Sequence, residues 1–121
     1  MKLPSLKDAL VVGPAGFKTR VASRDGSISA EDTAALARLI TIAKGDAGQS
    51  RRVADFLLAW WNAGECGSFD LTNLWAVDEA IATDMLTVLA MIAKVQTYPD
   101  TLGYESDFMA IVKAWRPELR G

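Results

Sequence analysis

The sequence predicts an all-α fold, a compact bundle of four main helices preceded by an irregular, partly mobile N-terminal arm. Apolar residues recur three and four positions apart in four stretches of the chain, which is the spacing of an amphipathic helix. Short connectors with glycine, proline and aspartate separate these stretches and favour antiparallel neighbours. The 121 residues, half of them apolar and 23% charged, suit one globular domain. We expect an arm over residues 1–28 and a helical domain over residues 29–121.

The arm and the helical domain carry opposite charge. Residues 1–28 hold five bases and two acids, a balance of +3, whereas residues 29–121 hold eight bases and thirteen acids, a balance of −5. Pro4, Gly13 and Pro14 interrupt any long helix in the arm. Two interpretations stay open: the basic arm rests on its own acidic domain, or it contacts nucleic acid or an acidic partner.

The first helix is expected to begin after Ser29 and to end at Gly45. Ser29 is a favourable N-cap residue, and Asp32 stands where a capping box has an acidic side chain. Leu36, Leu39 and Ile40 then supply the apolar stripe. Glycine directly after such a stripe is a common helix stop.

The second helix is expected from Arg51 to about Gly64, in the stretch "RRVADFLLAWWNAGECG". At 100° per residue, Trp60 and Trp61 fall on one apolar stripe with Val53, which favours a place in the core. Trp61 lies at the edge of this stripe. Leu58 falls near the opposite, polar face, so it either packs under another segment or is exposed for a partner.

Two further helices follow a short turn. Asp70 suits the cap of a turn through Leu71, Leu74 and Trp75, and Asp78 suits the cap of a helix over residues 79–96. That helix is apolar around most of its circumference, so we expect it at the centre of the fold. The fourth helix is expected after a connector that contains Pro99, with Ser106 as its cap and Pro117 as its stop.

The residue inventory argues against catalysis. The chain has no histidine, the commonest general base and metal ligand, and its single cysteine, Cys66, has no resolving partner. No glycine-rich stretch carries the lysine of a phosphate loop. We therefore expect no enzymatic activity, no catalytic residue, no metal and no cofactor. A lone cysteine and the lack of a signal or membrane-spanning segment favour a cytoplasmic location.

Two groups of residues are candidate binding sites. Arg51 and Arg52 stand at the expected start of the second helix, where positive charge opposes the helix dipole. Either Asp46 or Asp55 compensates them, or they bind an anionic partner near exposed backbone N–H groups. The second group consists of apolar side chains that could be exposed for a macromolecule: Leu58, Trp61, Leu74 and Trp75.

Residues 32–119 are similar to an uncharacterised bacterial domain family. The resemblance lies in "DTAALARLITIAKGDAGQSRRVADFLLAWWNAGECGSFDLTNLWAVD" and in "YPDTLGYESDFMAIVKAWRPEL". We associate this family with accessory genes of integrative and conjugative elements and plasmids. The resemblance implies a bacterial cytoplasmic setting and supplies neither an activity nor catalytic residues.

The sequence therefore favours a small non-enzymatic interaction or accessory protein. Its expected partner is a protein not yet identified or a second copy of the chain in a homodimer. We expect no binding to a membrane. The first alternative is a nucleic-acid-binding protein that uses the arm together with Arg51 and Arg52; we rank it lower because the acidic domain repels phosphate. The second alternative is an enzyme that uses carboxylates or Cys66.

Overall fold

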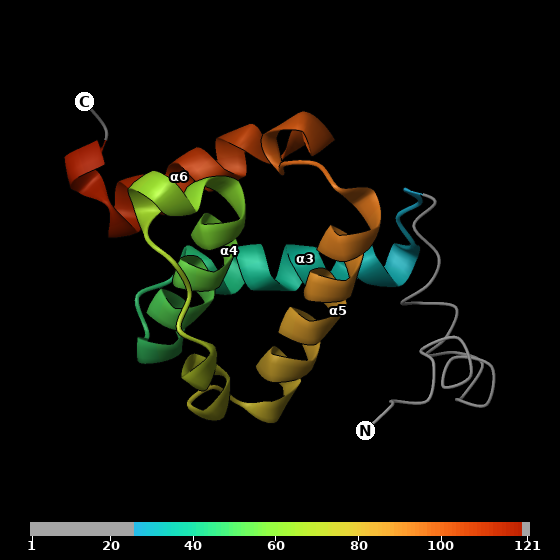
Figure 1. Ribbon diagram of the computed structural model, residues 1–121. Coiled ribbons are helices and arrows are strands. Elements are labelled where there is room, and N and C mark those ends of the chain that lie inside the picture. Colours follow the sequence, from blue (N-terminus) through green and yellow to red (C-terminus); the bar gives the residue numbers. More distant parts are fainter. Residues whose placement is uncertain (1–25, 120–121) are drawn as a thin grey trace, which may run out of the picture.

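A computed structural model describes residues 26–119, which form an all-α bundle of four helices (Figure 1). These are α3 (Ala30–Ala43), α4 (Gly48–Cys66), α5 (Glu79–Val95) and α6 (Glu105–Trp115). Three short helical turns, η1 (Leu71–Trp75), η2 (Asp100–Tyr104) and η3 (Pro117–Leu119), lie between or after them. No strand occurs within residues 26–119, and the predicted fold class is confirmed. The predicted partly mobile arm lies outside the described residues, except for residues 26–28.

Helix α3 is the central helix of the bundle. It begins with the predicted capping box, in which the Asp32 backbone N–H donates to Ser29 Oγ at 3.0 Å and the Ser29 backbone N–H donates to Asp32 Oδ2 at 3.1 Å. Its buried stripe packs against α4, α5 and α6, which all contact it. The expectation that the helix over residues 79–96 would be central is therefore wrong. That helix, α5, packs on α3 with one side and leaves its other side exposed.

Two ion pairs fix how α5 is turned on α3. Arg38 donates to both carboxylate oxygens of Asp84, at 2.8 and 2.9 Å, and the Lys94 ammonium lies 3.0 Å from Asp32 Oδ2. Met85, Val88 and Met91 are buried on the same side of α5. The remaining side exposes Leu86 and Leu89, at 56% and 48% of their surface.

Helix α4 is broken near its end and is longer than predicted. It starts at Gly48, three residues before Arg51, and it runs to Cys66 with a non-helical residue, Asn62, inside it. Asn62 Oδ1 accepts a hydrogen bond from the Glu65 backbone N–H at 3.2 Å, which caps the last turn and lets the helix continue past the predicted end at Gly64. Gly67 ends it with φ +101°, a conformation that suits glycine.

Helix α6 closes the bundle across α3 and α4. The chain direction turns by 116° between α5 and the segment Asp100–Trp115, so these two neighbours are not antiparallel. Phe108 is buried, and its ring is nearly perpendicular to the indole rings of both Trp60 and Trp61, each at a centroid distance of 5.8 Å. The Trp115 indole N–H donates to the Ala43 carbonyl at 2.7 Å and ties α6 to the end of α3. Ser106 lies inside α6 instead of capping it.

We expect Asp32→Ala to destabilise the protein by about 3 kcal/mol, because it removes a cap and leaves Lys94 unpaired in a largely buried position. The matched control is Asp107→Ala, which breaks the more exposed pair with Lys44 and should cost less than about 1 kcal/mol. Urea denaturation followed by circular dichroism measures both free energies. Equal costs for the two variants would contradict a special role for Asp32.

Asp32 also makes stability depend on pH in the acid range. Burial alone would raise the pKa of this carboxyl, but the Ser29 backbone N–H and the Lys94 ammonium together hold its pKa below the ordinary value of 3.8. The stabilisation is therefore complete above the ordinary value and is lost as the pH falls through the lower folded-state pKa. We expect the stability advantage of the wild type over Asp32→Asn to be constant at neutral pH and to shrink only below about pH 4. A series of urea titrations across this range measures it.

Candidate functional site

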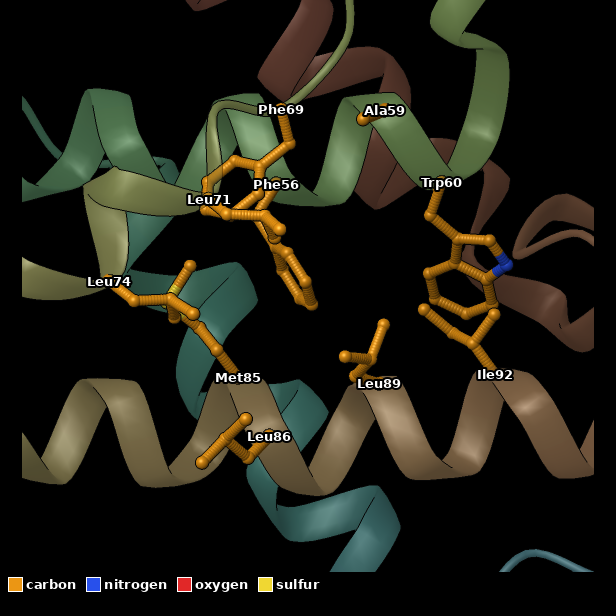
Figure 2. A pocket seen from close by; sticks show the side chains of 10 residues that line it. All are labelled: Phe56, Ala59, Trp60, Phe69, Leu71, Leu74, Met85, Leu86, Leu89 and Ile92. Atoms are coloured by element: carbon orange, nitrogen blue, oxygen red, sulfur yellow. The ribbon is translucent and has the colours of Figure 1, made fainter. Parts of the chain in front are cut away.

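An apolar groove lies between α4, η1 and α5. Both long helices pack on α3, and the chain from Phe69 through η1 closes one end of the space between them (Figure 2). The groove has a volume of about 270 Å³. Helix α4 contributes Phe56, Ala59 and Trp60 to its lining. The other lining residues are Phe69, Leu71 and Leu74 from the connector, and Met85, Leu86, Leu89 and Ile92 from α5.

The aromatic wall of the groove is held in place from outside it. The Trp60 indole N–H donates to the Thr97 carbonyl at 3.1 Å, and in Figure 2 the indole nitrogen points away from Leu89. Phe56 and Phe69 meet edge to face with a centroid distance of 5.3 Å. Hydrogen bonding and ring contacts therefore fix the wall while the surfaces that face the groove stay apolar.

The open side of α5 carries a single charge, at its first position. The helix has three charged residues, and two of them, Asp84 and Lys94, are paired with α3 on the opposite side. The third, Glu79, stands at the first position of the helix. The exposed strip consists of Leu86, Leu89 and small uncharged residues, whereas the exposed side of a helix is ordinarily polar or charged. Contiguous apolar surface of this kind marks sites of interaction.

Of the predicted apolar candidates, the structure brings one to the groove and one beside it. Leu74 lines the groove, and Trp75, in the same turn, is 85% exposed. Trp61 is half-buried against Phe108. Leu58 has no exposed surface, so its proposal as a contact for a partner is wrong. Because α4 packs on both α3 and α6, its buried face is wider than the apolar stripe in the sequence indicates.

Sequence reasoning missed most of the groove. Phe69, Leu71, Leu86 and Leu89 were not candidate site residues, although they form its two sides. The usable signal was Leu86, an apolar residue that falls off the main stripe of its helix. A helix with surplus apolar residues on a second face needs a second contact surface.

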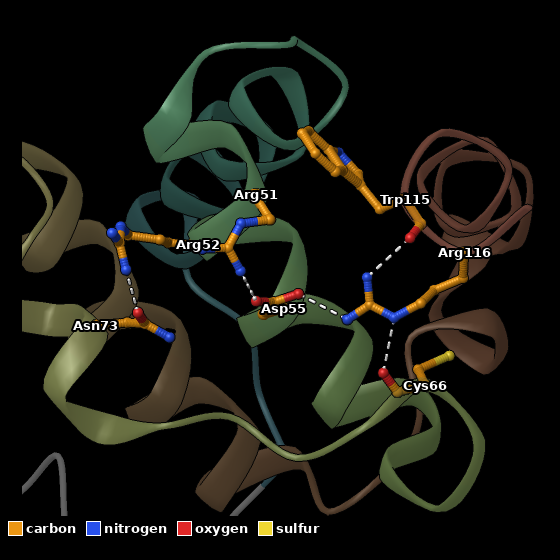
Figure 3. A network of polar contacts seen from close by, with 7 residues as sticks. All are labelled: Arg51, Arg52, Asp55, Cys66, Asn73, Trp115 and Arg116. Carbon is orange, nitrogen blue, oxygen red and sulfur yellow. Dashed lines mark hydrogen bonds and ion pairs between the residues drawn. The ribbon is translucent and has the colours of Figure 1, made fainter.

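Arg51 and Arg52 belong to a network of internal bonds (Figure 3). The Arg51 guanidinium lies 3.3 Å from Asp55 Oδ2, and Arg52 donates to Asn73 Oδ1 in η1. Asp55, one of the two predicted compensating acids, also accepts from Arg116 at 2.7 Å. Arg116 donates in addition to the carbonyls of Cys66 and Trp115, at 2.9 and 3.0 Å. The bonds of Asp55 join α4 to the end of α6, and the bond of Arg52 joins α4 to η1. Both arginines that were candidates for binding an anionic ligand therefore make contacts within the protein.

Cys66 lies at the end of α4 next to this network, and it is buried. Burial raises the pKa of its thiol, and the charge of Arg116 opposes that effect only in part. At neutral pH the side chain is therefore a thiol, whereas nucleophilic and metal-binding cysteines are thiolates. Within residues 26–119 no three acidic or cysteine side chains gather in a group that could hold a metal ion.

The helices were also compared with the requirements of a membrane span. No single helix in the described part of the chain combines the necessary length with a sufficiently apolar composition. Helix α5 and the segment Asp100–Trp115 meet these requirements only as a pair, which is bent by 116°.

We expect Arg116→Ala to destabilise the protein by about 2 kcal/mol, because it removes several charge-assisted hydrogen bonds in a mostly buried position. Arg51→Ala removes only the exposed partner of the same carboxylate and should cost less than about 1 kcal/mol. Thermal or urea denaturation compares the two. A larger loss of stability for Arg51→Ala would mean that Asp55 stabilises α4 itself and not the contact between α4 and α6.

Comparison with known proteins places the chain in a family. The family of unknown function DUF7673 matches residues 33–116, which include all of α4, α5 and the groove. No curated protein and no solved structure matches the chain. The matched range also lies within the residues on which the sequence resemblance was based. The chain belongs to DUF7673, a family of unknown function.

Proposed function

We propose that this protein is a small non-enzymatic interaction module that binds an apolar helical segment of a protein partner in the groove between α4, η1 and α5. The observation that carries the proposal is the exposed apolar strip of α5, with Leu86 and Leu89 at the edge of a preformed apolar groove. An amphipathic helix that lies in such a groove buries leucine-type side chains at helical spacing.

The lining of the groove favours a protein segment over a small molecule. Sites for small ligands combine apolar walls with a few polar groups that orient the ligand, and they are commonly larger than about 300 Å³. The side chains that line this groove are apolar, and the Trp60 indole N–H is used by Thr97. A surface without orienting polar groups suits an apolar helix face, whose register is set by shape.

The charge distribution supports a protein over a nucleic acid as the partner. Residues 26–119 carry seven basic and thirteen acidic side chains. Five of the basic side chains form ion pairs within the chain and a sixth, Arg52, bonds to Asn73. Binding to DNA or RNA needs a cluster of free bases that neutralises several phosphates.

The absence of histidine from the chain and the buried thiol of Cys66 support a non-enzymatic role. The proposal extends to the cellular setting that the sequence resemblance implies. We place the protein in a bacterial cytoplasm as an accessory factor of a mobile genetic element, and its single cysteine suits a reducing compartment.

Site-specific photo-cross-linking in the cells that produce the protein tests the partner. The photo-reactive amino acid p-benzoylphenylalanine replaces Ala93, an exposed residue one turn beyond Leu89 on α5. The matched control carries it at Ala110, an exposed alanine on α6 away from the groove. We expect an adduct with a different protein from position 93 and none from position 110, and we expect Leu86→Ser with Leu89→Ser to abolish it.

Three results would overturn the proposal. These are equal adducts from both positions, adducts that survive the double serine substitution, and adducts that join only copies of this chain. The last result would replace the partner by a homodimer.

A further inference from the structure

We propose that residues 3–12 of this same chain dock in the groove as a short helix and shield it until a partner displaces them. The inference uses the groove of the proposed function, but it does not depend on which partner binds there. It assigns to the N-terminal segment the role of an internal competitor for the site.

The segment has the apolar pattern that the groove requires. Leu3, Leu6 and Leu10 recur at helical spacing, and Pro4 is tolerated in the first turn of a helix. Ten residues of helix are about 15 Å long. The α5 side of the groove, from Met85 to Ile92, covers about 10 Å of helix axis. The groove volume of about 270 Å³ exceeds the roughly 150 Å³ of a cavity that accepts benzene, so it has room for more than one leucine side chain.

The connection is long enough for the segment to reach the groove. The described chain begins at Gly26, close to the capping box of α3, where Asp32 pairs with Lys94 in the last turn of α5. Residues 13–25 lie between this point and the segment, and thirteen residues span up to about 45 Å when extended. Helix α5 is about 26 Å long and about 10–12 Å wide with its side chains. The connection can therefore pass around α5 and reach either end of the groove.

Charge favours this occupant over a second copy of the chain. Asp70, Asp78 and Glu79 are exposed at the η1 end of the groove, where they outnumber Arg52, the basic side chain that bonds to Asn73 there. Two grooves facing each other would bring these acids together. Residues 1–12 carry Lys2 and Lys7 against Asp8, a balance of +1, so the segment brings no net negative charge to these acids. The covalent tether adds a high effective concentration that a separate chain lacks.

The experiment uses the purified full chain at low concentration, with p-benzoylphenylalanine at Ala93 and with no partner present. After illumination, peptide mapping by mass spectrometry identifies the residues joined to position 93. We expect an adduct within one chain that maps to residues 3–12. Leu6→Ser with Leu10→Ser should abolish this adduct. The matched control is Val11→Ser with Val12→Ser, which also replaces two branched apolar side chains, but at positions outside the leucine stripe. This control should leave the adduct in place.

The outcomes separate this inference from the proposed function. No adduct to residues 3–12, an adduct that survives Leu6→Ser with Leu10→Ser, or adducts only between chains would each overturn it. Failure here leaves the cross-linking to a partner in cells unaffected, because that adduct is formed with a different protein. Circular dichroism of each variant verifies that the helical domain is folded.

Discussion

The two ion pairs between α3 and α5 decide what the molecule presents to its surroundings. Helix α5 has the most apolar composition of the four helices and carries leucines on the side away from α3, so hydrophobic burial alone does not exclude another rotation about its axis. Asp84 lies in the second turn of the helix and Lys94 in its last turn, and they meet Arg38 and Asp32 on α3. Leaving either charge buried without its partner would be costly, and this fixes the rotation. Once α5 is turned in this way, Leu86 and Leu89 must face outward.

The groove exists because α4 and α5 pack on the same helix, α3, and hardly on each other. Helices α4 and α5 each pack extensively on α3, whereas they make few contacts with one another. The connector through Phe69 and η1 covers one end of the space between them, and Arg52 bonds that connector to α4 through Asn73. On the other side of α4, the Asp55–Arg116 pair and Phe108 hold α6. The scaffold around the groove is thus tied together by contacts that do not enter it.

Helical periodicity and caps predicted the four helices, the Ser29–Asp32 capping box and the Asp70 cap of η1. They did not predict the burial of Leu58, which depends on the packing of α4 on both α3 and α6. Nor did they predict the break at Asn62, whose side chain caps the turn that follows it. The groove was largely missed for a related reason. A sequence shows that α5 has apolar residues on two faces, but the choice of the exposed face depends on two acid–base pairs 46 and 62 residues apart in the chain.

The position of Trp60 has a consequence for how the groove can be observed. Its indole ring meets Phe108 in the core on one side and lines the groove on another, with its nitrogen bonded to Thr97. Anything that enters or leaves the groove changes the polarity around this ring without breaking the bond that orients it. Trp60, one of the four tryptophans of the chain, is therefore a built-in optical reporter, whose own emission shifts to the blue when water leaves the groove.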